Sequence, residues 1–332
     1  MPTSTGEDFL KNSVPKENQQ YLSMPVIYPI GGGKGGIGKS FVSANLGATI
    51  AKLGHQVVMV DLDLGASNLH TLLGIESPAS GIGDFLNRSV ENLEQVATPT
   101  MVPNLAFISS MNCAMEIPNL AYFQKQKIIK AIRKLPFDYV ILDLGAGTNF
   151  NTLDFFLTAS EGIFICIPEP TSIENAFRFV QATYSRKIKN IIKYNDFNAA
   201  VQHAVFNTDP THRIALQPST IINIVSRRDP DKENFLKDKL SEFNFKLIIN
   251  QVRNNSDPTL GQKIETACNR HMHASFHYLG GIKYDERVPE SIFSKNLYVN
   301  KYPYTSISND LKTIAAMITK NNAPAPELNQ LG

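Results

Sequence analysis

The sequence has few cysteines, and none of them are paired. Its 332 residues include only Cys113, Cys166 and Cys268, which lie far apart, with no CxxC pair and no metal-ligand spacing. An iron–sulfur carrier or reductase needs cysteines grouped at one cluster, so this class is disfavoured. We expect the three thiols to be reduced and structural.

The chain also lacks an excess of charge and a long apolar run. Its 32 basic and 30 acidic residues give a net charge of +2, so any nucleic-acid or membrane-surface binding must be local. The N-terminus has no cationic start followed by an apolar run, and no segment reaches the length of a transmembrane helix. We expect a cytoplasmic protein and leave peripheral contact with the inner face of the cell membrane open.

Apolar runs of strand length alternate with helical periods from Pro25 onward. Runs that are apolar on both faces indicate a buried parallel sheet, because helices cover both of its faces in a doubly wound α/β fold. The apolar content of 42% suffices for one large domain, predicted at 25–320. A flexible arm is predicted at 1–24 and a flexible tail at 321–332. The expected strands are 26–30, 57–62, 105–108, 139–142, 162–167, 246–250 and 278–282.

Helical periods fill several of the intervals between these runs. Helices are predicted at 40–53, where Gly54 gives a stop, at 121–135, from about 172, from the 229–230 turn to 240, and at 307–322. About eighty residues separate the runs at 162–167 and 246–250, several times what one crossover needs. We therefore predict a helical insertion at 185–245 within the same domain.

A glycine-rich loop follows the first predicted strand. Gly33, Gly38, Lys39 and Ser40 satisfy G-x-x-x-x-G-K-[ST], with a strand before and a helix after the motif. Such glycines let backbone N–H groups form an anion nest at a helix N-terminus. We expect Lys39 against the β- and γ-phosphates of a nucleotide and the Ser40 hydroxyl on Mg²⁺. The nucleotide-binding positions expected here are Gly33, Gly35, Gly36, Ile37, Gly38, Lys39, Ser40 and Phe41.

A second lysine, Lys34, lies in the same loop. The stretch "KGGIGKS" resembles the deviant Walker A motif of the MinD/ParA family of P-loop ATPases. The resemblance implies ATP and Mg²⁺ as cofactors and slow, partner-stimulated ATP hydrolysis. It also implies a homodimer formed with ATP, in which Lys34 reaches the phosphates of the second copy and offsets charge that develops in phosphoryl transfer. The alternative for Lys34 alone is a solvated loop lysine.

Two further predicted strands end in carboxylates. In "VVMVDLDLGASNL", Asp61 and Asp63 point the same way if the strand continues that far. "FDYVILDLGAG" has the Walker B form, with Asp143 at the strand end as a Mg²⁺ ligand. The family resemblance implies that Asp63 positions the attacking water and that Asp61 supports the water shell of the metal. The implied catalytic set is Lys34, Lys39 and Asp63, and the implied metal set is Ser40, Asp61 and Asp143.

Base recognition is suggested near the end of the chain. Asn250, in "KLIINQVRN", matches the adenine-contacting asparagine of the family, and an amide suits the adenine edge. The alternative is a turn-forming asparagine at a strand end. Tyr284 and Asp285 lie in "GGIKYDERV", where the family closes the base pocket. The "DLGAG" segment, with Gly145 and Gly147 as switch II, resembles the flagellar-number regulators of the FlhG/FleN subgroup, which implies control of flagella or another cellular machine.

Other functions fit some of the residues. A ParA-like partitioner of DNA or cargo would use a basic cluster of Arg186, Lys187, Lys189, Lys193, Arg227 and Arg228, although a solvated helix face explains the same residues. A bacterial tyrosine kinase is suggested by Tyr298, Tyr302 and Tyr304, but these precede a helix and that group lacks the extra lysine. The apolar side of 307–322 is expected to pack on the domain instead of on a membrane. An unidentified regulatory protein partner is expected.

Overall fold

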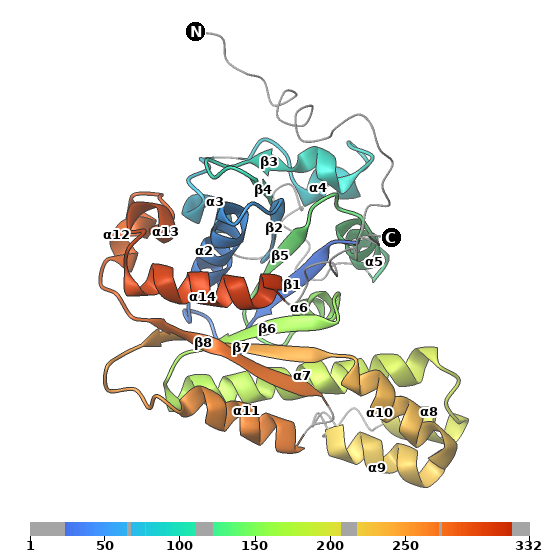
Figure 1. The fold of residues 1–332 in the computed structure, drawn as a ribbon. Coiled ribbons are helices and arrows are strands. Elements are labelled where there is room, and N and C mark those ends of the chain that lie inside the picture. The colour runs from blue at the N-terminus through green and yellow to red at the C-terminus, as the bar shows by residue number, and fades with distance from the viewer. Residues whose placement is uncertain are drawn as a thin grey trace, which may run out of the picture.

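A central β-sheet with helices on both faces organises the molecule (Figure 1). The computed structural model describes residues 24–64, 68–76, 78–110, 122–206, 218–271 and 274–320. Apart from Met24, the predicted arm at 1–24 lies outside these residues, and so does the predicted tail at 321–332.

The sheet is almost entirely parallel, as the apolar runs predict. Its order is β3-β4-β2-β5-β1-β6-β7-β8, and only the β3–β4 pair within it is antiparallel. This pair was not predicted, because β3 has only two residues, one of them a proline, and so short a strand shows no alternating pattern. The strands are β1 (Val26–Gly31), β2 (Val57–Leu62), β3 (Thr98–Pro99), β4 (Leu105–Ile108), β5 (Tyr139–Leu144), β6 (Glu161–Cys166), β7 (Asn244–Val252) and β8 (Ser275–Lys283).

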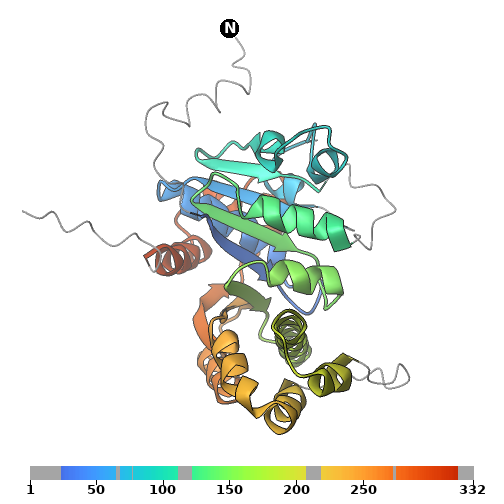
Figure 2. The same cartoon turned by 90° about the vertical axis from the view of Figure 1, so that its right-hand side faces the viewer.

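Two apolar clusters, one on each side of the sheet, form the core. One contains side chains of α2, α13 and α14, and the other contains side chains of α4 to α11. Figure 2 shows the two helical layers on opposite sides of the sheet. This arrangement confirms the doubly wound α/β fold. The helices are α2 (Lys39–Lys52), α3 (Leu69–Leu72), α4 (Ile82–Leu86), α5 (Tyr122–Ile132), α6 (Phe150–Phe156), α7 (Pro170–Tyr194), α8 (Ala199–Phe206), α9 (Pro218–Arg228), α10 (Glu233–Ser241), α11 (Leu260–His271), α12 (Val288–Phe293), α13 (Tyr298–Lys301) and α14 (Ser306–Lys320), with 3₁₀ turns η1 (Leu93–Val96) and η2 (Pro230–Lys232).

Extra helices stand between α7 and β7, in the region of the predicted insertion. Helix α7 is continuous to Tyr194, so the additional elements are α8, α9, η2 and α10, and residues 207–217 lie outside the described part. Val201, Ile221 and Leu236 are buried in the same apolar cluster as α7. These helices therefore share the core of the domain.

The apolar side of α14 faces the protein. Leu311, Ile314 and Ile318 are buried against α2 and β8, and the Tyr28 hydroxyl donates to the Ile318 carbonyl oxygen at 3.2 Å. The predicted packing of this helix on the domain is therefore confirmed. Within the described ranges, no helix combines the length and the apolar character needed to cross a membrane.

The thiols in the described residues are unreactive. Cys166 and Cys268 are free and buried, and burial raises the pKa of each to about 12. Because a thiol must ionise to react, these two are structural, as expected. Cys113 lies outside the described residues.

Candidate nucleotide site

The glycine-rich loop joins β1 to α2 at the carboxyl edge of the sheet. Gly38 forms the N-cap of α2 with φ of 84°, in the left-handed region that favours glycine. A Cβ atom at Gly38 would lie 2.3 Å from the Asn250 Nδ2 atom. Backbone angle and close approach both require glycine here, and the N-terminus of α2 is left open to an anion.

Asp143 lies at the base of this loop. It is buried at the end of β5, opposite Ile30 of β1 and Asp61 of β2. The Ser43 hydroxyl donates to Asp143 Oδ1 at 2.9 Å, and the nearby Ser40 hydroxyl also favours the ionised form of this carboxylate. Burial nevertheless raises the pKa of Asp143 to about 6. Ser43 was missed by the sequence reasoning, although its place three residues after Ser40 on a helix puts both on one side.

Lys39 is the cation of this cluster. Burial lowers the pKa of its ammonium group, while the nearby carboxylates of Asp143 and Asp63 oppose that shift. The oxygens of Ser40 and Asp143 are adjacent, and hydroxyl and carboxylate oxygens are the ligand type that Mg²⁺ prefers. In the described residues no group of three His, Cys, Asp or Glu side chains could hold a metal alone. The residues therefore fit a Mg²⁺ ion that nucleotide oxygens and water help to bind.

Asp61 and Asp63 do not alternate along one strand, because β2 ends at Leu62. Asp61 is buried and accepts from the backbone N–H groups of Asp63 at 3.0 Å and Leu69 at 3.4 Å. A Cβ atom built on Gly145 would lie 3.1 Å from Asp63 Oδ1. Asp61 thus shapes the loop between β2 and α3, and Asp63 stands against the segment after β5. Residues 65–67 lie outside the described part.

The segment after β5 is connected to the phosphate loop. The Gly147 N–H donates to the Gly32 carbonyl oxygen at 3.1 Å, and Gly147 has φ of 91°. Two residues later, Asn149 caps α6 by accepting from the Thr152 N–H at 2.9 Å. Hydrogen bonds thus connect the loop to the segment that leads into α6.

Lys34 lies at the exposed tip of the loop. Its side chain is 44% exposed, and its Nζ atom is 3.9 Å from Glu169 Oε2, just before α7. Cβ atoms on the neighbouring Gly35 and Gly36 would meet nothing within 4 Å. Sequence reasoning did not identify Glu169, because the pairing depends on the fold. Lys34 remains accessible to another molecule.

Asn250 contacts the phosphate loop directly. Its Nδ2 atom donates to the Ile37 carbonyl oxygen at 2.9 Å, and the side chain is buried. The next residue, Gln251, has φ of 57° within an irregular stretch of the β7–β8 ladder, and such irregularities re-aim side chains. Asn250 thus anchors the loop that would hold the phosphates, and its contact with adenine stays a prediction.

Tyr284 and Asp285 have different surroundings. The Arg253 guanidinium, just beyond the end of β7, lies over the half-exposed Tyr284 ring, 3.7 Å from the ring centre. Arg253 was not singled out from the sequence, and its only signal was its place three residues after Asn250.

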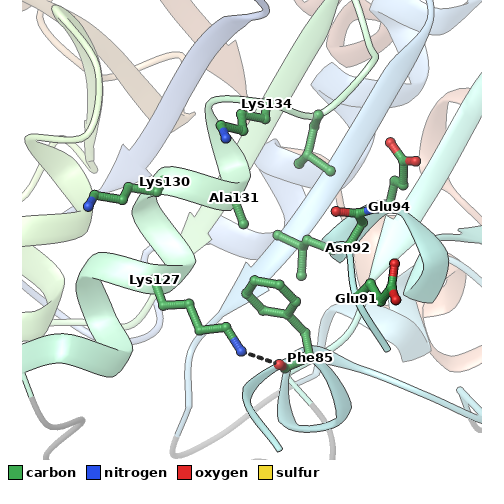
Figure 3. Close-up of a pocket in the computed structure, with 10 residues that line it drawn as sticks. Phe85, Glu91, Asn92, Glu94, Lys127, Lys130, Ala131 and Lys134 are labelled. Carbon is green, nitrogen blue, oxygen red and sulfur yellow. Dashed lines mark hydrogen bonds between the residues drawn. The ribbon is translucent and has the colours of Figure 1, made fainter. Parts of the chain in front are cut away.

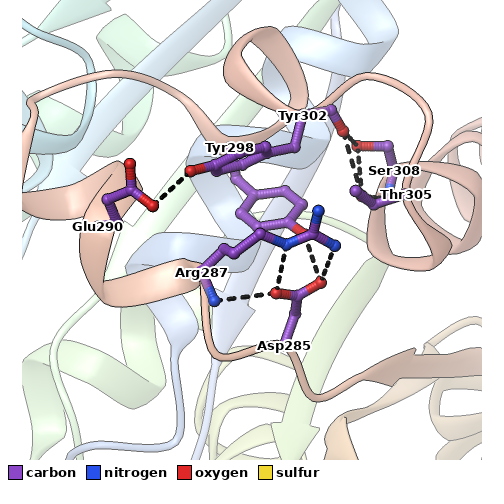
Figure 4. A network of polar contacts seen from close by, with 7 residues as sticks. All are labelled: Asp285, Arg287, Glu290, Tyr298, Tyr302, Thr305 and Ser308. Carbon is purple, nitrogen blue, oxygen red and sulfur yellow. Dashed lines mark hydrogen bonds and ion pairs between the residues drawn. The ribbon is translucent and has the colours of Figure 1, made fainter.

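Asp285 is engaged inside the chain (Figure 4). It accepts from Arg287 Nε at 2.9 Å and Nη2 at 2.6 Å, and from the Tyr298 hydroxyl at 2.8 Å. The hydrogen bonds from Arg287 hold the pKa of Asp285 well below its usual range. Tyr298 in turn packs edge-on against Phe41, with ring centres 5.9 Å apart. Asp285 thereby braces the C-terminal helices against the start of α2.

A separate pocket of about 300 Å³ lies between α4, η1 and α5 (Figure 3). Lysines of α5 face Glu91 and Glu94 across it, and Lys127 Nζ donates to the Phe85 carbonyl oxygen at 2.6 Å. None of its lining residues comes from the phosphate loop, so it is not part of the nucleotide site.

Comparison with known proteins points to one family. Residues 29–298 match the family model described as the CobQ/CobB/MinD/ParA nucleotide binding domain. The septum site-determining protein MinD of Synechocystis is 32% identical over 150 residues, which are 45% of this chain and 55% of that protein. The chain thus spans about half the length of the curated relatives it matches.

Solved structures share the fold. A MinD from Pyrococcus horikoshii complexed with Mg-ADP has a TM-score of 0.59 at 17% identity and covers 90% of this chain and 98% of its own. The Aquifex aeolicus MinC:MinD complex gives a TM-score of 0.57 at 17% identity, with 90% and 98% covered. The family model covers well over half of the sequence, and the chain therefore belongs to the MinD/ParA-type family of P-loop ATPases.

Proposed function

We propose that this chain is an ATP-dependent dimerising switch that hydrolyses ATP to ADP and phosphate. The observation that carries the proposal is the separation of its two loop lysines. Lys39 is buried beside Asp143 and Asp63, whereas Lys34 is exposed at the tip of the loop. One lysine is thus placed to bind phosphate within the chain, and the other is available to a second copy.

The residues would divide the work as follows. Lys39 and the loop N–H groups bind the phosphates, and Ser40 and Asp143 hold Mg²⁺, which when bound neutralises charge on the phosphate oxygens. Asp63, next to Gly145, orients the attacking water. Lys34 of the second copy offsets charge that develops on the transferred phosphoryl group. Asn250 and Tyr284 border the base, while Asp285 acts only through the network that it braces.

The output would be spatial regulation in the cytoplasm. Curated relatives are named as septum site-determining proteins, and one solved relative is a complex with MinC. The "DLGAG" segment favours the flagellar-number subgroup within this family. We further propose that 25–320 form one ATPase domain with α8 to α10 as its helical addition, and that a regulatory protein stimulates hydrolysis.

The basic cluster supports a DNA-partitioning role less well than the phosphate loop supports the ATP-dependent switch. Arg186 is bonded to Asp154, and Lys187 lies over the Phe243 ring. Arg228 donates to the Ala200 carbonyl oxygen. These contacts leave only part of the basic cluster available to DNA phosphates, and binding to a DNA duplex needs many phosphate contacts.

The test compares the wild type with Asp63→Ala. We expect the wild type to bind a fluorescent ATP analogue, to form dimers with ATP and Mg²⁺, and to release phosphate slowly. Asp63→Ala should form the same dimers and keep them, because binding survives while water orientation is lost. Light scattering and phosphate release measure the two properties. A wild type without nucleotide binding, or an Asp63→Ala variant that stays monomeric, would contradict the proposal.

A further inference from the structure

A broad groove lies between α5, α6, α7 and α8, on the side of the sheet away from α2. Its volume is about 940 Å³. Every wall is helical, because all lining residues belong to these four helices except Thr148, which lies two residues before α6. It is distinct from the nucleotide site described above.

Aromatic side chains stand open to solvent along this groove. Tyr122 is 57% exposed, Phe150 70%, Tyr194 59% and Phe206 42%, one from each of the four helices. The hydroxyls of Tyr122 and Tyr194 are 2.8 Å apart, which joins α5 to the end of α7. Single exposed aromatics are ordinary, but several that line one groove are typical of a surface that binds a protein.

The groove is also positively charged. Among the described residues that line it, Asp154 is the one acid, and its carboxylate is neutralised by Arg186 and Lys125. Lys189 and Lys193 line the groove and form no ion pair with a described carboxylate. Lys193 Nζ lies 5.2 Å from the Tyr194 ring centre and 5.8 Å from that of Tyr122. Cations therefore stand directly beside the apolar rings.

We propose that this groove binds an acidic amphipathic helix of a partner protein. Carboxylates of that helix would pair with Lys189 and Lys193, and its apolar side chains would contact Phe150, Tyr194 and Phe206. A helix is the fitting shape because the walls are helical and offer no strand edge to extend. Two lysines without a carboxylate partner can bind a few carboxylates of a peptide. They are too few for the phosphate backbone of a nucleic acid, whose binding needs many contacts.

The groove adjoins the segment that contacts the phosphate loop. Thr148 and Phe150 line it, and the preceding Gly147 donates to Gly32. A helix bound here would touch the residues between the nucleotide site and α6. The groove is thus placed to couple the partner to the nucleotide state. This coupling rests on the proposed function, whereas binding of the helix does not.

The experiment begins with a displayed library of random peptides of about 16 residues, roughly 24 Å of helix. Full-length protein is the bait, and the Lys189→Glu/Lys193→Glu variant is the counter-selection. We expect enriched peptides to combine Asp or Glu with Leu or Phe at helical spacing. A synthetic labelled peptide of that kind should bind about tenfold more weakly to the double charge variant and to Phe150→Ala.

The matched control is Arg270→Glu/Lys283→Glu, which makes the same charge change at exposed positions on α11 and β8. It should bind the peptide like the wild type. Affinity for an ATP analogue should be equal in all variants, so loss of the nucleotide site is distinguished from loss of the groove. Enrichment of no peptide, of peptides without acids, or an equal loss in the control would overturn the proposal. So would a labelled single-stranded oligonucleotide that binds the wild type and is lost in the Lys189→Glu/Lys193→Glu variant.

Discussion

At the scale of single residues, Asp143 shows how a fold holds a carboxylate in a buried position. Its carboxylate is buried at the end of β5, and burial raises its pKa to about 6 although Ser40, Ser43 and Lys39 favour the ionised form. A carboxylate held against its solvation preference is typical of a functional position. We expect a bound Mg²⁺ ion to offset the free-energy cost of keeping this carboxylate charged.

Replacing Asp143 by Asn should separate stability from binding. The folded pKa of about 6 exceeds the ordinary aspartate value of about 3.9, so this group lowers stability as pH rises between them, and the cost is fully present at pH 7. Asp143→Asn should raise the free energy of unfolding of the ligand-free protein at pH 7 by on the order of 1–3 kcal/mol. Urea denaturation with and without Mg²⁺ and a non-hydrolysable ATP analogue measures both effects.

The ligand should stabilise the wild type and leave Asp143→Asn almost unchanged, because the amide cannot supply the anionic oxygen. Asp138→Asn is the control. Asp138 is exposed, directly precedes the other end of β5, and accepts from the Gln56 N–H at 2.8 Å. It should retain the ligand effect. Ligand stabilisation of equal size in both variants would remove Asp143 from the metal site.

At the scale of elements, a buried ion cluster joins α6 to α5 and α7. Asp154 of α6 accepts from Arg186 Nε at 2.7 Å and Nη2 at 2.9 Å and pairs with Lys125. Burial opposes the charge of Asp154, but the hydrogen bonds from Arg186 and Lys125 lower its pKa overall. Lys125 also donates to Asn151 at 3.2 Å. The cluster holds in place α6, the helix that follows the segment after β5.

Asp154→Asn should be strongly destabilising, because it leaves Lys125 buried without its counter-charge. Loss of one partner from a buried pair costs about 3–5 kcal/mol. Glu174→Gln is the control, since its pair with Arg178 on α7 is exposed and should contribute less than about 1 kcal/mol. Because the pKa of Asp154 is lowered, its contribution is present above pH 4 or so and is lost as pH falls through the folded pKa. Equal losses in both variants by chemical denaturation would show that the cluster does not hold α6.

The elements that could be predicted are those whose pattern is local. Strands buried on both faces read as apolar runs, and the long helices α2, α5, α7 and α14 show their period and their ends. Helices α3, α4, α6, α11, α12 and α13 were not predicted. Those of one or two turns show too little period and are set by packing, whereas the twelve-residue α11 is long enough to show a period and was missed. Strand β3 was missed because it too is short.

The same division holds in the nucleotide site. Lys39, Ser40 and Asp143 could be predicted to lie together because motif spacing is a property of the sequence, and the fold brings them together. Contacts between distant segments could not be predicted: Asn250 with Ile37, Asp285 with Tyr298, and Lys34 with Glu169. The left-handed backbone of Gln251, which accompanies the placement of Asn250, has no signal in a residue that is neither glycine nor asparagine.

At the scale of the whole molecule, the exposed Lys34 and the buried Lys39 imply different defects. Without Lys39, a protomer loses its own phosphate contact. Under the proposed function, a protomer without Lys34 keeps its own site but cannot complete the site of a second copy. Two defective variants should therefore restore each other if the second lysine acts between copies, since a symmetric dimer contains two composite sites.

Mixing Lys34→Ala and Lys39→Ala in equal amounts tests this directly. In a mixed dimer, the Lys34→Ala protomer provides an intact Lys39, and its partner provides the missing Lys34. Random assortment makes half of the dimers mixed with one complete site each, so phosphate release should rise from near zero to at most about a quarter of the wild-type rate. The control mixes Lys34→Ala with a Lys34→Ala/Lys39→Ala double variant, in which no complete site can form. If light scattering shows that dimers form in the mixture and every pairing still stays inactive, Lys34 acts within its own chain, and the dimeric active site would have to be abandoned.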